Sequence, residues 1–352
     1  MIGAGSAGAG APNAAGKVGS RSLASAGVIV VNPTVSRLRD PERRQRVLAT
    51  ASRAVEARTG VEPVVIEADD PLVMRDRLAI ALDDDPALVS VVGGDGTVRD
   101  VAAVLGDRPV ALAIVPAGTA NLFAAALRIP LEPERAARAI EGSRARHVDL
   151  GRIRHAAAGG DDIVDQMFMV GAGIGFDARV MAGTRRSSKR RLGRYAYFTT
   201  AARELARAAP IPLRVSAEGS ELDLEAFEVL VANSGELIPG LLRPALRVDP
   251  ADGRLDVFIV AGGGRAAAVR GAIEAIGRRR LGRSGSGCSY RLRVRSIRVE
   301  AGSHEPVEVD GDVAGSGWFE ASCVPKALTV LVPERGHSPA VDARRLAATR
   351  RR

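Results

Sequence analysis

Cysteine, histidine and aromatic side chains are scarce in this chain of 352 residues. It has two cysteines and four histidines, and aromatic residues make up only 3%. Two cysteines in so long a chain cannot form a disulfide framework, which favours a reducing compartment. The histidines are scattered without the spacing typical of a zinc site. Disulfide-stapled and zinc-centred folds are therefore not expected, and the core should consist mainly of Val, Leu, Ile and Ala.

Long apolar segments are lacking as well. No run of 18 apolar residues occurs, so no transmembrane helix is expected. The N-terminus does not have the charged and then apolar pattern of a signal peptide. Residues 1–26 are mostly Gly, Ala and Ser, which predicts a disordered leader, and residues 334–352 are expected to form a basic tail. We expect a cytoplasmic protein, associated peripherally with the inner face of the membrane.

Lysine is scarce although the chain is basic. The net charge is +9, and of the 50 basic residues only Lys17, Lys189 and Lys326 are lysines. Clusters of arginine suit anionic lipid surfaces or the phosphates of nucleotides and nucleic acids. No RNA- or DNA-binding motif accompanies them, so nucleic acid is not predicted as a partner. At residues 189–198 the cations lie beside aromatic residues, which suits a membrane interface or, equally, a charged helix surface.

Strand and helix patterns alternate in the first part of the chain. Aspartate followed by proline predicts that helices begin at Asp40–Pro41 and at Asp70–Pro71. Strands are predicted at 27–31, 64–66, 87–92 and 110–115, and further helices at 97–105 and 119–127. The alternation predicts an α/β domain at residues 27–144, with a parallel sheet covered by helices on both faces.

Strand patterns dominate after residue 145. They occur at 145–153, 163–170, 213–217, 224–233, 255–260, 290–300 and 307–309. Helical patterns interrupt them at roughly 176–207 and 265–278. We therefore expect a second, β-rich domain at residues 145–325.

Three glycines follow the third predicted strand, in the segment Gly93-Gly94-Asp95-Gly96-Thr97. Glycine lets a backbone approach a ligand closely, and the N-terminus of the following helix supplies N–H groups that suit phosphate. Asp95 cannot attract bare phosphate, but it can hold Mg²⁺ or order a water on it. The alternative is an ordinary glycine-rich turn with Asp95 as a helix cap. The spacing is not that of a Walker A loop.

A second loop of this type, with Gly118, Thr119 and Asn121, follows the fourth predicted strand. Asn32 and Thr34 follow the first strand. Because the carboxyl ends of parallel strands lie at one edge of a sheet, we expect the three loops to face one crevice. Together they predict a nucleotide site.

The order of these motifs resembles the diacylglycerol kinase catalytic-domain family, which includes bacterial diacylglycerol kinases and the sphingosine and ceramide kinases. The resemblance covers roughly residues 27–333 and includes the segments GGDGT, PAGTAN, LRIP, GAGIGFDA, VAN, DPADGRLDV and VDGD. It implies an α/β domain with an NAD-kinase-like fold, a C-terminal β-sandwich domain, and ATP in the cleft between them. It also implies that a strand at about 326–333 returns to the first domain.

The resemblance also assigns roles in an ATP- and Mg²⁺-dependent transfer of phosphate to diacylglycerol or a similar lipid alcohol, with phosphatidic acid as the product from diacylglycerol. Asp95 is expected to act on the Mg²⁺–phosphate assembly. Relatives are often dimers, so a homodimer is a further expectation. The residues expected to bind the nucleotide are Asn32, Thr34, Gly93, Gly94, Gly96, Thr97, Gly118, Thr119 and Asn121.

Asp310 is the candidate general base. It follows the strand pattern of Val307–Val309 and precedes Gly311, and a carboxylate at a strand end can activate a hydroxyl. In the resembled family the matching residue is the proposed base. On spacing alone, an ordinary Asp-Gly hairpin turn is the simpler interpretation. The family usually has DGE here, whereas Asp312 shortens the third residue by one methylene.

Two further sites follow from the same resemblance. Asp249, Asp252 and the backbone carbonyl of Leu255 are expected to hold a structural Mg²⁺, with a plain polar turn as the equal alternative. Asp177 is expected to organise a turn at Gly173–Gly175 or to cap a helix.

Two departures from the family pattern keep other functions open. Arg37 stands where the first motif commonly has glycine, and Leu122 where the second often has aspartate. Loss of that glycine is expected to alter the phosphate-facing turn. The alternatives are an NAD kinase, which shares GGDGT and a related fold, and a non-catalytic protein that binds nucleotide or lipid.

Overall fold

A computed structural model describes residues 26–157, 160, 162–187, 209–235, 248–261 and 289–334. Most of the predicted leader, the basic tail beyond residue 334, the cationic segment at 189–198 and the helix expected at 265–278 lie outside the described residues. Within the described part of the chain, every helix is too short or too polar to traverse a lipid bilayer.

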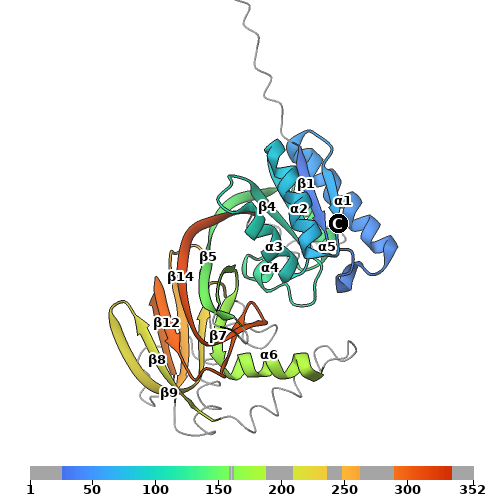
Figure 1. Ribbon diagram of the computed structural model, residues 1–352. Helices are drawn as coiled ribbons and strands as arrows, with labels where there is room; N and C mark the ends of the chain where they lie inside the picture. The colour runs from blue at the N-terminus through green and yellow to red at the C-terminus, as the bar shows by residue number, and fades with distance from the viewer. Residues whose placement is uncertain are drawn as a thin grey trace, which may run out of the picture.

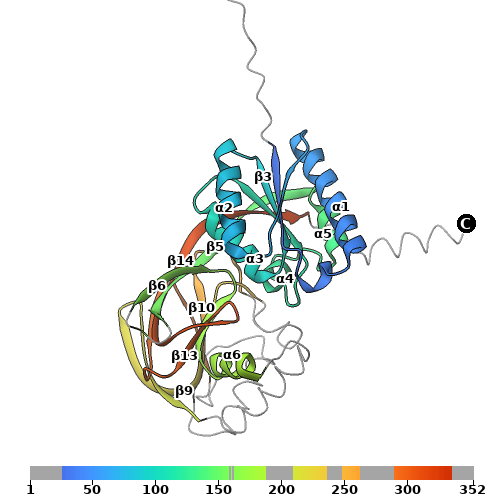
Figure 2. The same ribbon diagram turned by 45° about the vertical axis from the view of Figure 1, so that its right-hand side comes forward.

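The N-terminal part forms an α/β domain around parallel strands (Figure 1). Strand β1 pairs with β2 on one side and with β3 on the other, and β3 pairs with β4, all in parallel. Helices α1 and α5 cover one face of this sheet, and α2 and α3 cover the other (Figure 2). The elements are β1 (Gly27–Val31), α1 (Pro41–Thr59), β2 (Val64–Glu67), α2 (Pro71–Ala81), β3 (Leu88–Gly93), α3 (Asp95–Leu105), β4 (Ala111–Pro116), α4 (Leu122–Ala126) and α5 (Pro133–Ala139), with short 3₁₀ turns η1 (Ser36–Leu38) and η2 (Leu82–Asp84).

The helix starts follow the predicted cap chemistry. The side chain of Asp40 accepts a hydrogen bond from the N–H of Glu42, and that of Asp70 accepts from Leu72 and Val73. Because such a cap pairs N–H groups that lack a partner in the first turn, it fixes where each helix begins. One prediction was wrong, because the helix expected at 119–127 begins only at Leu122, and the sequence analysis made no prediction for α5.

The C-terminal part is a β-sandwich, so the predicted fold class is confirmed. Its neighbouring strands are antiparallel, and α6 packs on β7 and β13. The expected strand at 290–300 is split in two at Arg295. The elements are β5 (Ser143–Ala157), β6 (Ile163–Phe168), β7 (Gly171–Gly175), α6 (Phe176–Ser187), β8 (Ile211–Ala217), β9 (Ser220–Ala232), β10 (Leu255–Ala261), β11 (Ser289–Val294), β12 (Ser296–Glu300), β13 (Pro306–Val309) and β14 (Asp312–Pro333).

The segment Gly171–Gly175 is a central strand, and the expected turn at Gly173–Gly175 is therefore wrong. This strand, β7, lies between β9 and β13 and pairs with both. Glycine weakens a strand pattern in the sequence because it has no side chain to pack. Here the missing side chains make room for neighbours: a Cβ on Gly173 would lie 3.0 Å from the Oε1 of Glu228.

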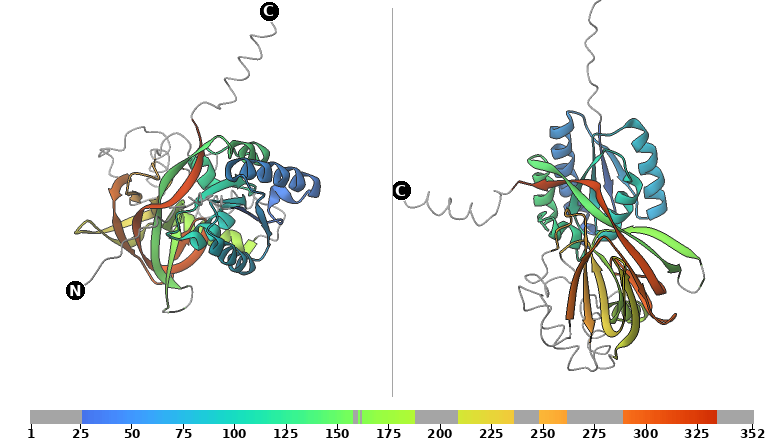
Figure 3. Two further views of the ribbon diagram at one scale, coloured as in Figure 1. Left: turned by 90° about the horizontal axis from the view of Figure 1, so that it is seen from above. Right: turned by 90° about the vertical axis from the view of Figure 1, so that its left-hand side faces the viewer.

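Two long strands, β5 and β14, run through both domains (Figure 3). Near its end β14 pairs in parallel with β4 through Thr329 and Val330, whereas earlier residues pair with β12 and β13 of the sandwich. The buried side chains form one core in each domain, and Leu328, Val330 and Leu331 belong to the core of the α/β domain. The domains are therefore joined by continuous sheet.

Gly175 offers a test of the close packing around β7. It has φ +122°, and an added Cβ would lie 2.4 Å from the carbonyl oxygen of Phe227. We expect Gly175→Ala to lower the free energy of unfolding by about 3 kcal/mol, because backbone strain and overpacking add. The measurement is urea denaturation followed by circular dichroism.

Gly219→Ala is the matched control for this substitution. Gly219 also has a positive φ, +78°, but nothing lies within 4 Å of an added Cβ. Gly219→Ala should lower the free energy of unfolding by the backbone strain alone, about 1 kcal/mol. Equal costs for the two variants would contradict the packing described for β7.

Candidate functional site

The three predicted phosphate loops lie together at the carboxyl edge of the parallel sheet. They follow β1, β3 and β4, which are neighbours in the sheet. The N–H of Asn32 donates to the carbonyl of Val92 at 3.1 Å, and the N–H of Ala117 donates to the carbonyl of Gly93 at 2.8 Å. Helices α3 and α4, which begin in these loops, lie on the side of the α/β domain that faces the sandwich (Figures 1 and 2).

The first and second loops touch backbone to backbone at Gly94 and Gly118. A Cβ added to Gly118 would lie 2.6 Å from the Cα of Gly94, and one added to Gly94 would lie 3.3 Å from the Cα of Gly118. Contacts this short exclude a side chain at Gly118. The two glycines therefore let the loops approach each other, which is a structural reason for them besides any contact with phosphate.

The other predicted nucleotide residues shape the same loops. Buried Asn121 has φ +53°, and its side chain exchanges two hydrogen bonds of 2.9 Å with the backbone of Gly118. Asn32 donates to the hydroxyl of Thr97 at 3.4 Å and accepts from both the N–H and the hydroxyl of Thr34. The hydroxyl of Thr119 lies 3.4 Å from that of Ser36. The structure thus brings these predicted residues together, while their contact with a nucleotide stays a prediction.

Asp95 is turned toward the second loop. Its Oδ1 accepts a hydrogen bond of 3.3 Å from the N–H of Phe123, in the first turn of α4. Burial raises the pKa of this carboxyl, and hydrogen bonds from the backbone at Leu122, Phe123 and Asn121 oppose the rise. Asp95 therefore links the two loops. Its predicted action on Mg²⁺ is not tested by these contacts.

The two departures from the family pattern, Arg37 and Leu122, both contact or adjoin the residues of the second loop. The guanidinium of Arg37 donates to the carbonyl of Leu131, and the N–H of Arg37 donates to the carbonyl of Ala117 at 3.2 Å. Arg37 thus ties the first strand's loop to the second loop. Leu122 begins α4, next to the Asp95 carboxylate.

The carboxylate of Asp310 is held by three consecutive amide groups. The N–H groups of Met169, Val170 and Gly171 donate to it at 2.8–3.2 Å. Burial raises the pKa of Asp310, and these hydrogen bonds and the charge of Arg99 partly offset the rise. Asp310 also has φ +50°, in the tight turn from β13 to β14. The residue is thus both the predicted hairpin aspartate and a positioned carboxylate with raised basicity.

Asn233 holds the segment that binds Asp310. Its side chain donates to the carbonyl of Met169 at 3.0 Å and to that of Asp149 at 2.9 Å, and its N–H donates to the carbonyl of Val170 at 2.9 Å. Met169 and Val170 pack in the core of the α/β domain. The segment is therefore fixed from both domains, so that its N–H groups point at the carboxylate.

An ion pair joins the Asp310 turn to the helix of the first phosphate loop. The Nη2 of Arg99, on α3, lies 3.4 Å from the Oδ2 of Asp312. The sequence analysis missed Arg99, although its position four residues after Asp95 places both on one face of a helix. That spacing is the signal that could have identified it.

Two further carboxyl groups missed in the sequence lie along the strands beside Asp310. Buried Glu308, on β13, accepts a hydrogen bond of 2.8 Å from the N–H of Gly311, and Glu228, on β9, accepts one of 2.8 Å from Asp177. Burial and the Asp177 charge raise the pKa of Glu308 and of Glu228 well above the ordinary value. Glu308 alternates with valines, a pattern typical of a strand with one exposed face. Because β13 is central in the sheet and α6 covers it, that face is buried.

The two carboxylates predicted to hold a structural Mg²⁺ pair with arginines in this structure. Asp249 lies 2.7 Å from the Nη2 of Arg146, and Asp252 pairs with Arg293. Leu255 is the first residue of β10. Among the described residues, no group of three His, Cys, Asp or Glu side chains could hold a metal ion. These arginine partners are typical of the polar turn given as the equal alternative, and the metal site stays a prediction.

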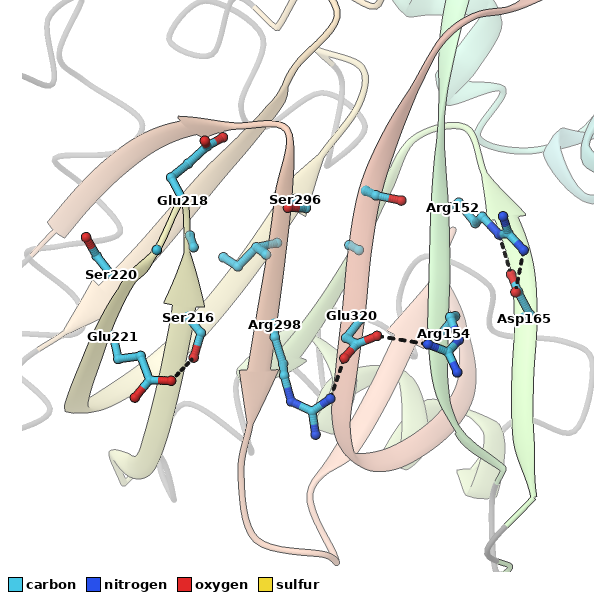
Figure 4. Close-up of a pocket in the computed structure, with 15 residues that line it drawn as sticks. Arg152, Arg154, Asp165, Ser216, Glu218, Ser220, Glu221, Ser296, Arg298 and Glu320 are labelled. Carbon is cyan, nitrogen blue, oxygen red and sulfur yellow. Dashed lines mark hydrogen bonds and ion pairs between the residues drawn. The ribbon is translucent and has the colours of Figure 1, made fainter.

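A hollow of about 960 Å³ lies elsewhere, on the outer face of the sandwich (Figure 4). Charged pairs on neighbouring strands line it, including Arg152 with Asp165 and Arg154 with Glu320. Lipid-binding pockets are mostly apolar, so this polar, charge-paired surface does not fit a lipid chain. It contains none of the predicted site residues.

Comparison with known proteins gives the class of this arrangement. The family model described as "Diacylglycerol kinase catalytic domain" matches residues 27–153, and "YegS C-terminal NAD kinase beta sandwich-like domain" matches residues 170–332. A crystal structure described as a diacylglycerol kinase of Bacillus anthracis superposes with a TM-score of 0.63 at 20% identity, over 88% of this chain and 97% of that one. The two family models, on a fold of this kind, define a phosphotransferase of the kinase type.

Curated relatives agree with this class. "Probable lipid kinase YegS-like" of Pseudomonas aeruginosa is 34% identical over 68% of this chain and 75% of that protein. "Diacylglycerol kinase" of Mycobacterium tuberculosis is 30% identical over 79% and 87%. An uncharacterized protein of Synechocystis is 27% identical, and there the match spans only 54% of the relative. The chain belongs to the diacylglycerol kinase catalytic-domain family of lipid kinases, as its motifs predicted.

The buried carboxyl of Glu308 predicts a pH dependence of stability. A carboxyl whose pKa is raised in the folded protein binds its proton more tightly there than in the unfolded chain. Its contribution to stability is greatest in acid and is lost as the pH rises from the ordinary value of 4.5 through the raised one. Glu308→Gln keeps an oxygen that can accept from Gly311 but cannot ionise, so the variant should not lose stability as the pH rises. At high pH its free energy of unfolding should exceed that of the wild type by on the order of 1–3 kcal/mol.

The measurement is urea denaturation of both proteins between pH 5 and 9. The exposed Glu225→Gln on β9 is the control and should follow the wild type throughout. A Glu308→Gln protein whose stability runs parallel to the wild type at every pH would show that Glu308 does not retain its proton on folding.

Proposed function

We propose that this protein is an ATP- and Mg²⁺-dependent kinase that phosphorylates the hydroxyl of diacylglycerol or a similar lipid alcohol. The observation that carries the proposal is the ion pair between Arg99 and Asp312. It places the turn of the candidate base, Asp310, against the helix that begins in the first phosphate loop. A nucleotide on one domain and a base on the other can then meet at one acceptor hydroxyl.

The reaction requires positioning and one proton transfer. The hydroxyl oxygen of the lipid forms a bond to the γ-phosphorus, the bond from that phosphorus to the oxygen bridging the β-phosphate breaks, and ADP leaves. The Asp310 carboxylate accepts the hydroxyl proton as general base. Because burial raises its pKa, it is a stronger base than an ordinary aspartate. The amides of Met169–Gly171 keep it in place.

The phosphate loops hold the nucleotide in this proposal. The backbone N–H groups of Gly94, Gly96 and Thr97, at the N-terminus of α3, donate to phosphate oxygens. Asn32, Thr34 and the Thr119 hydroxyl border the same phosphates. Mg²⁺, when bound, neutralises phosphate charge, and Asp95 in the first loop is the carboxylate that fits it, directly or through water.

NAD phosphorylation is the alternative, because the sandwich domain also resembles that of NAD kinases. We favour a lipid because curated relatives that cover most of this chain are named lipid kinases. A lipid acceptor remains in the bilayer, so the enzyme would act at the membrane surface. A homodimer stays an expectation from the family.

The acceptor is tested with purified protein, Mg²⁺ and γ-labelled ATP, offered diacylglycerol in mixed micelles, a sphingoid base, a polyprenol or NAD. We expect labelled phospholipid from at least one lipid alcohol and no labelled NADP. Because the pocket for the chain is apolar in such enzymes, a soluble dinucleotide should not compete. Label transfer to NAD alone would overturn the proposal.

Asp310→Asn tests the base. We expect kcat to fall on the order of 10²–10⁴-fold, the usual contribution of a general base. The affinity for ATP should remain, since the phosphate loops are unchanged. Asp165→Asn, on the outer face of the sandwich, is the matched control and should keep full activity.

The result must be separated from unfolding, because Asp310 also accepts hydrogen bonds. Thermal denaturation gives the range in which the variant is folded, and calorimetry there gives its ATP affinity. If the folded variant binds ATP and transfers phosphate as fast as the wild type, Asp310 is not the base. If neither protein turns over any acceptor although both bind ATP, the chain is a non-catalytic member of the family.

A further inference from the structure

Arg99 occupies a distinctive place between the two halves of the site. It lies on α3 one helical turn after Asp95 of the first phosphate loop, on the same helix face. Its guanidinium reaches Asp312, 3.4 Å away, and the side chain is 23% exposed. Asp312 is two residues from Asp310, across Gly311. The guanidinium therefore lies between the loop that would hold the nucleotide and the turn that carries the candidate base.

The surroundings of Arg99 are negatively charged. Asp95, Asp310 and Asp312 are all on the elements that meet here, and a transferred phosphate would add more negative charge. The predicted nucleotide-binding residues contain no lysine or arginine. The guanidinium of Arg37, in the loop after β1, donates to the carbonyl of Leu131. Among the described residues of these loops and of the Asp310 turn, Arg99 is thus the cation placed to face a phosphate.

Phosphoryl transfer depends strongly on such a cation. The charge on the oxygens of the transferred group must be neutralised, and arginine does this well because its planar guanidinium can contact two phosphate oxygens at once. We propose that Arg99 is the residue that binds the γ-phosphate of the nucleotide, and that Asp312 holds its guanidinium in place. This inference rests on the proposed function, since it assigns a role within the same phosphoryl transfer.

The inferred contact predicts a difference between ATP and ADP. Besides Asp312, Arg99 gains a second partner only when a γ-phosphate is present. Loss of Arg99 should therefore lower the affinity for ATP and leave the affinity for ADP unchanged. A residue that only joined the two domains would change both affinities alike, or neither. The ratio of the two affinities therefore separates a phosphate contact from a structural role.

The test compares Arg99→Gln with wild type by calorimetry in the presence of Mg²⁺ and without lipid. We expect ATP affinity to fall on the order of 10-fold or more with ADP affinity unchanged, and kcat with the lipid acceptor to fall on the order of 100-fold. Arg75→Gln is the matched control. Arg75, on α2, forms an ion pair of 2.6 Å with Asp100, the neighbour of Arg99 on α3. Its loss should change neither affinity.

Two further variants protect the test against misfolding. Arg99→Lys keeps the charge but not the planar fork, and should retain part of the preference for ATP. The double variant Arg99→Asp with Asp312→Arg exchanges the two charges and so keeps an ion pair between α3 and β14. It should restore stability in thermal denaturation. It should not restore phosphate transfer, because the arginine then stands on β14 instead of on the helix of the first phosphate loop.

Three results would overturn the inference. One is an unchanged ratio of ATP to ADP affinity in both Arg99 variants. Another is full recovery of kcat in the charge-reversed pair, which would make the ion pair a purely structural link. The third is a wild-type protein that binds no ATP, which would remove the proposed function itself. A wild-type kinase that is insensitive to Arg99 would remove this inference alone.

Discussion

The hydrogen bonds between Asp310 and three consecutive amides are the constraint on which the arrangement of this protein depends. Met169 and Val170 pack in the core of the α/β domain, whereas Val309, next to Asp310, packs in the core of the sandwich. The carboxylate therefore attaches a turn of one domain to a segment held by the other. Because amide N–H groups stabilise the charge while burial opposes it, one interaction both positions Asp310 and tunes its basicity.

The phosphate loops depend on a contact of a different kind. At Gly94 and Gly118 two backbones meet with no room for a Cβ at the second position. Asp95 then joins the two loops by accepting a hydrogen bond from the N–H of Phe123, and Asn121 braces the second loop by hydrogen bonds with Gly118. Residues that a motif marks as ligand contacts thus also build the surface itself. A loop fixed in this way has little entropy left to lose on binding a ligand.

Local chemistry explains why much of the α/β domain could be predicted from sequence. Aspartate caps, proline at the first helical position and continuous apolar strands act within a few residues, so the starts of α1 and α2 follow from neighbours in the chain. The clustering of Asn32, Gly93 and Gly118 follows from the geometry of parallel strands. The sandwich was less predictable: β7 consists of alternating glycines, and its stability comes from β9 and β13, which lie far away in the sequence.

The sequence by itself determined the fold class, the family and the three loops at the edge of the sheet, because motifs and caps are short-range signals. Only the tertiary structure decided which side chains of the two domains meet. Arg99 and Asp312 are more than 200 residues apart, and Glu308 is buried because strands and a helix from elsewhere cover it. The same holds for Asp249 and Asp252, whose spacing allows a metal ion but whose partners are arginines from β5 and β11. Such contacts depend on which strands become neighbours, and that is set by packing of the whole chain.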